Sequence, residues 1–104
     1  MILVTGATGQ LGRLVLAALL KKVPAASLVA AVRSVEKAKD IAARGVQVRQ
    51  ADYNKPESWD AALKGVDKVL LISSNELGQR AKQHRIVVDA AKRAGVNLLA
   101  YAAL

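Results

Sequence analysis

Short apolar runs alternate with stretches of helical periodicity along the whole chain. Runs rich in Val, Ile and Leu, bounded by glycine, proline or polar residues, are typical of strands buried in a parallel sheet. Between them, apolar residues recur every three to four positions, which is typical of a helix with one buried face. Five strands are predicted, at residues 2–5, 28–32, 46–50, 68–72 and 97–102.

Four helices are predicted in the intervals. The first runs from about residue 11 to residue 22, and the others cover residues 34–44, 56–64 and 78–94. Ser34 can cap the second helix through its hydroxyl group. The apolar face of the first helix consists of Leu11, Leu14, Val15, Ala18 and Leu19.

The order of these elements predicts an α/β fold. Right-handed crossovers between parallel strands place helices on both faces of one sheet. We expect a Rossmann-like, doubly wound parallel sheet of five strands in the order 3-2-1-4-5, with four helices, truncated before a sixth strand. The 104 residues are then one domain.

Composition excludes several kinds of site. The chain has no cysteine and a single histidine, His84, so disulfides and thiol nucleophiles are excluded and no metal site is expected. The apolar run at residues 2–5 has no basic leader and breaks at Gly6, so it resembles neither a signal peptide nor a membrane span. We therefore expect a cytoplasmic protein.

The charge balance is basic and indicates an anionic partner. Lys and Arg number 16 against 8 Asp and Glu, a formal net charge of +8. The basic residues are scattered, and no basic stripe carries the interleaved aromatic residues that stack on bases. Nucleic acid is therefore not the expected partner, and a phosphate-rich cofactor is favoured.

A glycine-rich loop, Gly6-Ala7-Thr8-Gly9-Gln10-Leu11-Gly12, separates the first strand from the first helix. In dinucleotide-binding folds the first glycine allows a tight turn, the second lets the backbone approach a pyrophosphate, and the third lets the helix pack closely. The helix N-terminus also favours an anion. The alternative is an ordinary glycine-rich turn. The predicted pyrophosphate-binding residues are Gly6, Thr8, Gly9, Gln10, Leu11 and Gly12.

Arg33 ends the second predicted strand, about 20 residues after Gly12, where NAD-binding proteins place an acidic residue on the ribose hydroxyl. A guanidinium there can pair with a 2′-phosphate through two hydrogen bonds, whereas a carboxylate would repel it. The alternative is a solvated surface arginine. The sequence thus predicts NADP(H) as the cofactor in preference to NAD(H).

Polar residues also follow the third and fourth strands, which point to the same edge of the sheet. Asp52 and Tyr53 are candidates to contact the adenine. Ser73, Ser74 and Asn75 are candidates for the nicotinamide side of the crevice. The alternative is a polar loop that serves no ligand.

These motifs resemble the opening of the atypical short-chain dehydrogenases. More narrowly, they are similar to the NmrA-like branch, which includes NADPH:quinone oxidoreductases and triphenylmethane reductases. The resemblance implies an NADP(H)-binding Rossmann domain in residues 1–104, with the glycine loop on the pyrophosphate and Arg33 on the 2′-phosphate. It covers nearly the whole chain, through residues 4–12, 22–25, 31–33, 49–53, 70–74 and 90–96.

Activity does not follow directly from this resemblance. Full-length members of the branch transfer hydride from NADPH to quinones or dyes, whereas other members only sense the cofactor. They are more than twice as long and carry a C-terminal substrate domain, absent here. No Tyr-x-x-x-Lys pair occurs, since Glu57 stands four residues after Tyr53 and the chain ends before the position four after Tyr101.

Two functions therefore stay open, and no catalytic residue is assigned. The chain is the cofactor-binding part of an NADPH-dependent oxidoreductase with a quinone-like acceptor, or it is a non-catalytic NADP-binding or redox-sensing module, including an excised or engineered Rossmann fragment. In the expected strand order residues 96–104 form an apolar edge, which favours pairing with another chain. We expect homo-oligomers through this segment.

Overall fold

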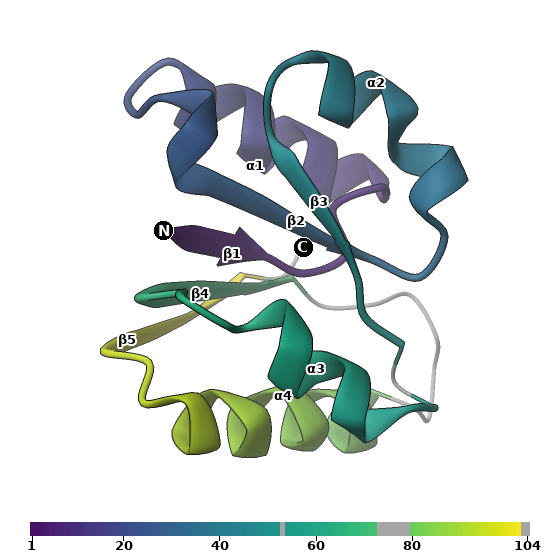
Figure 1. Ribbon diagram of the computed structural model, residues 1–104, viewed down its shortest axis with the longest axis vertical. Helices are drawn as coiled ribbons and strands as arrows, with labels where there is room; N and C mark the ends of the chain where they lie inside the picture. The colour runs from purple at the N-terminus through teal and green to yellow at the C-terminus, as the bar shows by residue number, and fades with distance from the viewer. Residues whose placement is uncertain (53, 73–79, 103–104) are drawn as a thin grey trace.

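The chain forms a five-stranded parallel sheet in the order β3-β2-β1-β4-β5, with a helical layer on each face (Figure 1). The computed structural model describes residues 1–52, 54–72 and 80–102. The strands are β1 (Ile2–Val4), β2 (Leu28–Val32), β3 (Gln47–Gln50), β4 (Lys68–Ile72) and β5 (Leu98–Ala102).

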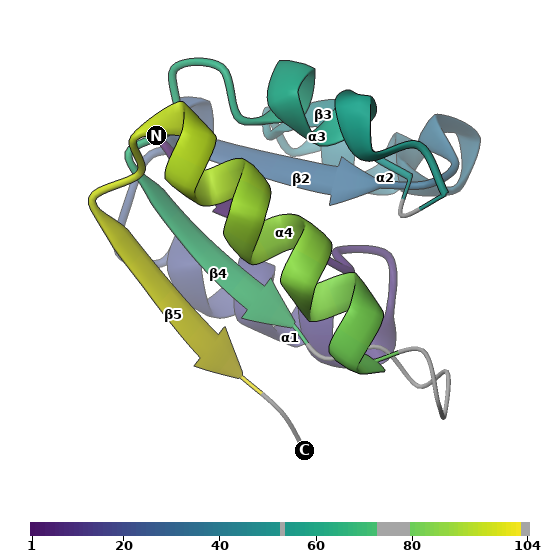
Figure 2. The same cartoon turned by 90° about the horizontal axis from the view of Figure 1, so that it is seen from below.

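The helices are divided between the two faces of the sheet. Two cover one face and two cover the other, and the view turned by 90° shows the second pair in front of the strands (Figures 1 and 2). The predicted α/β class with a Rossmann-like architecture is therefore confirmed. The first pair is α1 (Gln10–Leu20) and α2 (Lys39–Ala43), and the second is α3 (Pro56–Ala62) and α4 (Arg80–Ala94).

Both faces of the sheet are buried, because adjacent strand residues point to opposite layers. Leu3 packs into the cluster beneath α3 and α4, which also contains Trp59 and Val87. Its neighbour Val4 packs into the cluster on the α1 and α2 side, which also contains Leu16. This two-sided burial explains why β2, buried at every residue, has a continuous apolar run rather than an alternating one. The edge strand β3 differs, because Gln47 and Gln50 are exposed.

The predicted buried face of α1 is partly wrong. Leu14 is 65% exposed and Ala18 is also exposed, whereas Leu16 is buried. The cause is Gly12, which lies against the backbone of the preceding loop and sets the rotation of the helix. Leu16 stands four residues after Gly12 and so shares its buried side.

The predicted helix at 34–44 is also different in the structure. A 3-10 turn, η2 (Val35–Ala38), precedes the short helix α2. The N–H of Lys37 donates to the Ser34 carbonyl at 3.3 Å, the i→i+3 pattern of a 3-10 turn. Ser34 occupies the N-cap position of η2, but its hydroxyl makes no capping hydrogen bond.

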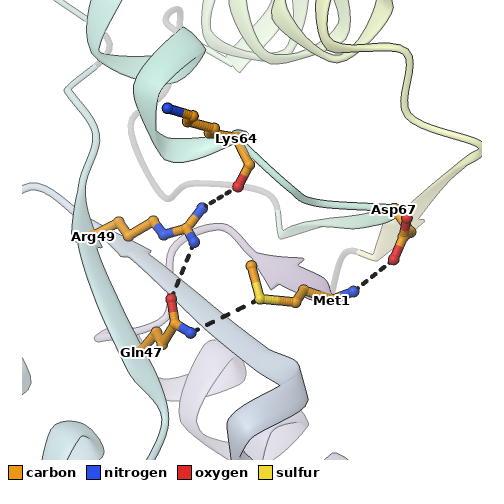
Figure 3. A network of polar contacts seen from close by, with 5 residues as sticks. All are labelled: Met1, Gln47, Arg49, Lys64 and Asp67. Atoms are coloured by element: carbon orange, nitrogen blue, oxygen red, sulfur yellow. Dashed lines mark hydrogen bonds and ion pairs between the residues drawn. The ribbon is translucent and has the colours of Figure 1, made fainter.

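Polar contacts connect elements at the amino edge of the sheet (Figure 3). The Met1 ammonium lies 2.7 Å from a carboxylate oxygen of Asp67, just before β4. The Arg49 guanidinium on β3 donates to the Ala62 and Lys64 carbonyls, each at 2.7 Å. These contacts attach β1 to β4 and β3 to the end of α3.

The described residues contain neither a membrane-spanning helix nor a cluster of metal ligands. No helix among them is long and apolar enough to cross a membrane. Nor do three His, Asp or Glu side chains gather there as they would around a metal ion. The cytoplasmic location stays a prediction.

Candidate functional site

The candidate site lies where the parallel strands end. The chain crosses from β1 to β2 on one side and later returns to β4 on the other, so β1 has a neighbour on each side at the centre of the sheet. Ligands of doubly wound sheets bind at the carboxyl ends of the strands, at such a reversal of strand order. The glycine-rich loop leaves β1 at this point (Figure 1).

Gly6 turns the chain away from β1. Its φ of +58° lies in the left-handed region, which only glycine adopts without strain. The loop then closes on itself, as the Gly9 N–H donates to the Gly6 carbonyl at 3.0 Å. The predicted turn-forming role of Gly6 is therefore confirmed.

Gly12 brings α1 into contact with the loop before it. A Cβ atom at Gly12 would lie 2.2 Å from the Gly6 carbonyl oxygen and 2.8 Å from the Ala7 Cα, both far inside van der Waals contact. No side chain fits there, so the predicted role of Gly12 in close packing is confirmed.

The N-terminus of α1 is suited to an anion. Its N-cap residue, Gly9, provides no side-chain cap, and the first turn contains no acidic residue. The first N–H groups of a helix have no partner within it and carry the positive end of its dipole. Gln10 is exposed beside Gly9, whereas the Leu11 side chain packs toward the core.

Thr5 was not among the predicted site residues, and it connects β1 to β4 at the reversal point. Its fully buried hydroxyl accepts a hydrogen bond from the Ile72 N–H at 2.8 Å and lies 3.4 Å from the Ile72 carbonyl. Its own N–H donates to the Leu70 carbonyl at 3.1 Å. A polar residue that ends a buried apolar run was the available signal.

Arg33 lies at the same edge, directly after β2, and its side chain is exposed. Its carbonyl accepts a hydrogen bond from the Gln50 side chain at 3.2 Å, which holds this backbone against the end of β3. The structure thus brings Arg33 and the glycine loop to neighbouring strand ends, as the sequence predicted. Whether Arg33 binds a phosphate stays a prediction.

Asp52 follows β3 and organises its own turn. One of its carboxylate oxygens accepts from the Asn54 N–H at 2.9 Å, and its N–H donates to the Ser58 hydroxyl at 2.8 Å. Its side chain is half-buried at the same edge of the sheet. The predicted contact with adenine stays untested. The candidates Tyr53, Ser73, Ser74 and Asn75 lie outside the described residues.

Arg13, another residue missed from the sequence, joins the glycine loop to the segment after β2. Its Nε donates to the Thr8 carbonyl at 3.1 Å and one terminal nitrogen to the Lys37 carbonyl at 3.2 Å. The other terminal nitrogen forms an ion pair with Asp40. Desolvation opposes ionisation of Asp40, but the hydrogen bond and charge of Arg13 outweigh it and lower the pKa of that carboxyl.

The family can be assigned once this geometry is combined with sequence comparison. The model of the NmrA-like family matches residues 1–104, the full length of the chain. The chain belongs to the NmrA-like family. The resemblance inferred from the glycine loop and its neighbouring motifs is therefore confirmed.

Curated relatives of this NmrA-like chain include two bacterial reductases. Quinone oxidoreductase 2 of Escherichia coli is 57% identical over 104 residues, all of this chain and 36% of the relative. An NAD(P)H azoreductase of Xenophilus azovorans is 39% identical over 97 residues, 92% of this chain and 32% of the relative. The chain thus spans about a third of the length of these relatives.

Solved structures show the same relationship. The NADPH-dependent quinone oxidoreductase of Escherichia coli, crystallised with NADPH, matches with a TM-score of 0.94 and 57% identity over 97% of this chain and 36% of that one. The triphenylmethane reductase of a Citrobacter species, in complex with NADP(H), matches with a TM-score of 0.92 and 53% identity, again over 97% and 36%.

Proposed function

We propose that this chain is the NADP(H)-binding domain of an NADPH-dependent oxidoreductase whose acceptor is a quinone-like compound. The glycine loop at the reversal point of the sheet, with Arg33 at the next strand end, is the observation that supports it most directly. Similarity to enzymes crystallised with NADPH supports the same cofactor.

The residues present fit such a cofactor. Gly6, Gly9 and Gly12 keep side chains away from the loop backbone, and the uncapped start of α1 suits a diphosphate. We assign the pyrophosphate to this loop, together with Thr8 and Gln10. When bound, NADPH would supply the hydride, and the protein would supply binding and orientation.

The other predicted contacts extend this assignment. Asp52 and Tyr53 are proposed at the adenine, and Ser73 to Asn75 on the nicotinamide side. Leu11 would contribute its backbone rather than its side chain, because that side chain packs toward the core. The side-chain assignments, at Asp52, Tyr53 and residues 73–75, are tested by single substitution and measurement of the Kd for NADPH.

Specificity for NADP(H) is assigned to Arg33. We expect Arg33→Asp to weaken NADPH binding by about 1.5–3 kcal/mol, because a charge-assisted hydrogen-bonded pair is lost and a repulsive carboxylate replaces it. NADH, which lacks the 2′-phosphate, should lose much less. Fluorescence titration of both nucleotides measures the two Kd values. An equal loss for both would contradict the assignment.

Turnover separates this proposal from a non-catalytic one. A redox-sensing NADP binder is the second candidate, and the lack of a Tyr-x-x-x-Lys pair within residues 1–104 favours it. The chain is mixed with NADPH and a soluble quinone, and absorbance at the nicotinamide band is followed. Binding with turnover supports the oxidoreductase, binding alone supports the sensor, and no binding contradicts both.

Self-association through residues 96–104 is proposed as well. Among the described strands, β5 pairs only with β4 and lies at the edge of the sheet. An edge strand can pair with the edge of another chain. We expect dimers or larger species in light scattering at high protein concentration. A monomer under those conditions would rule out this interface.

A further inference from the structure

Arg13 contacts three groups that belong to two separate parts of the candidate site. Its Nε bonds the Thr8 carbonyl within the glycine loop at 3.1 Å. Its terminal nitrogens bond the Lys37 carbonyl of η2 at 3.2 Å and the Asp40 carboxylate of α2. One guanidinium therefore connects the segment between β1 and α1 to the segment that follows β2.

These two segments hold the two phosphate positions of the proposed cofactor site. The glycine loop is assigned to the pyrophosphate, and η2 begins two residues after Arg33, which is assigned to the 2′-phosphate. Arg13 joins the two segments by side-chain hydrogen bonds and an ion pair, and Ala7 of the loop shares a buried apolar cluster with Ala38 and Ile41. The pairing of β1 with β2 sets the spacing of the two strand ends, and Arg13 adds a side-chain contact that holds the two segments beyond them.

The planar guanidinium is suited to this task. It offers five N–H donors in a fixed geometry, so that it can bind three acceptors at once, which the single ammonium of a lysine cannot do in the same directions. Its charge is directed at the Asp40 carboxylate. The side chain is 39% exposed, so it is partly covered by the segments that it joins.

We propose that Arg13 is a positioning residue that holds the pyrophosphate loop and the 2′-phosphate segment at the spacing that NADP(H) requires. This inference rests on the proposed NADP(H) binding. A ligand that spans both segments benefits from their fixed spacing, because less ordering is left to occur on binding. A ligand that contacts only the glycine loop benefits less.

Binding to variants of the chain tests the proposal. Arg13→Ala and Arg13→Lys should each raise the Kd for NADPH roughly three- to tenfold, with a smaller rise for NADH. Arg44→Ala removes an equal charge from the exposed end of α2 and should leave both Kd values within about twofold. When Arg33 is already replaced by alanine, Arg13→Ala should raise the Kd for NADPH by a smaller factor, because Arg13 acts by positioning the segment that carries Arg33.

The Asp40 variant distinguishes positioning from direct phosphate binding. If Arg13 contacted the 2′-phosphate itself, Asp40 would compete for it, and Asp40→Asn would tighten NADPH binding. If Arg13 positions the segments, Asp40→Asn removes one of its anchors and weakens NADPH binding. Glu36→Gln, on the exposed surface of η2, is the control for loss of one negative charge. Tighter NADPH binding by Asp40→Asn would overturn the proposal. Tightening beyond that of Glu36→Gln would indicate direct contact of Arg13 with the phosphate, and tightening equal to it would indicate only the loss of one negative charge.

Hydrogen exchange without nucleotide gives a readout independent of binding. Amides of residues 7–9 and 35–43 should exchange faster in Arg13→Lys and Asp40→Asn than in the wild type, with β2 and β4 unchanged. Unchanged exchange together with unchanged Kd values would overturn the positioning role while leaving the proposed function intact. A wild-type chain that binds neither nucleotide would overturn the proposed function, and this inference with it.

Discussion

At the scale of single residues, local chemistry could be predicted from the sequence and long-range contacts could not. Gly6 and Gly12 act within a stretch of seven residues, so their spacing alone indicated a turn and a close approach. Thr5 and Arg13 act through partners 67 and 24 to 27 residues away. Strand order could be predicted, but the choice of side-chain partners also depends on register and on the packing of α1 against η2 and α2, which no local pattern contains.

Alanine substitutions at Gly12 and Gly9 should have different effects, the first mainly on stability and the second mainly on NADPH binding. Gly12→Ala places a methyl group 2.2 Å from the Gly6 carbonyl oxygen, so we expect a loss of about 3 kcal/mol or more in the free energy of unfolding. Gly9 has a φ of −73°, which alanine adopts without strain, and a Cβ atom there would lie 3.3 Å from the Gly6 carbonyl oxygen. Gly9→Ala should therefore fold at a small cost in the free energy of unfolding.

Urea unfolding and NADPH titration separate these two outcomes. Gly9→Ala should remain folded but bind NADPH at least tenfold more weakly, since its methyl group occupies the proposed approach to the pyrophosphate. A Gly9→Ala chain with wild-type affinity would show that the ligand does not approach this backbone. A Gly12→Ala chain of wild-type stability would show that the loop and helix can separate without cost.

At the scale of elements, the positions of the strands could be predicted from apolar runs. The buried face of α1 and the division of the segment after Ser34 could not. β2 and β4 have the predicted bounds, because runs buried on both faces leave little choice of register. The face of α1 is rotated, so that Leu14 is exposed, because the approach of Gly12 outweighs the burial of one leucine. The segment after Ser34 is divided into η2 and α2, and the Lys37 carbonyl of η2 accepts a hydrogen bond from Arg13.

The end of α3 depends on a side chain from β3. Arg49 donates to the Ala62 and Lys64 carbonyls at the negative end of α3, a helix of 7 residues. Figure 3 shows the bond to Lys64. Arg49→Met should therefore lower the free energy of unfolding by about 1–3 kcal/mol, since charge-assisted bonds are lost in a half-buried position.

Arg85→Met is the matched control for this measurement. Arg85 is 82% exposed and pairs with Asp89 at 3.8 Å along α4, so its loss should cost less than about 0.5 kcal/mol. Chemical denaturation of the three proteins gives the comparison. Equal stabilities for Arg49→Met and Arg85→Met would show that the α3 carbonyls are satisfied as well by water.

At the scale of the whole molecule, the sheet brings together chemistry that is dispersed along the chain. Its parallel register places the glycine loop, Arg33 and Asp52 at one edge. The rule that parallel strands end together made this edge predictable from element order. The Met1–Asp67 pair at the amino edge was not predicted, because the expected adjacency of β1 and β4 does not give the register that sets Ile2 opposite Lys68.

That pair gives the stability a dependence on acid pH. The hydrogen bond from the Met1 ammonium, followed by its charge, lowers the pKa of Asp67 below its ordinary value of 3.8. A carboxyl with a depressed pKa in the folded state stabilises the fold above its unfolded pKa, and this contribution is lost as the pH falls through the folded value. The free energy of unfolding of the wild type should therefore fall as the pH drops below the ordinary carboxyl pKa of 3.8, partly because Asp67 becomes protonated.

Asp67→Asn should reduce that decline. Urea midpoints measured from about pH 5 to pH 2 should fall less steeply in the variant than in the wild type. Because both partners are solvent-exposed at the surface, high salt should diminish the difference. Parallel curves at low salt would show that the pair contributes nothing to acid stability.

The bond between Thr5 and Ile72 also has a consequence for the order of synthesis. During translation β1 and the glycine loop are made before β4, because Ile72, the partner of Thr5, follows 67 residues later. Until then β1 lacks one of its two neighbouring strands, and non-local pairing of this kind forms late. The proposed nucleotide site therefore includes a loop that is translated early, and it is completed only when the fourth strand has been translated.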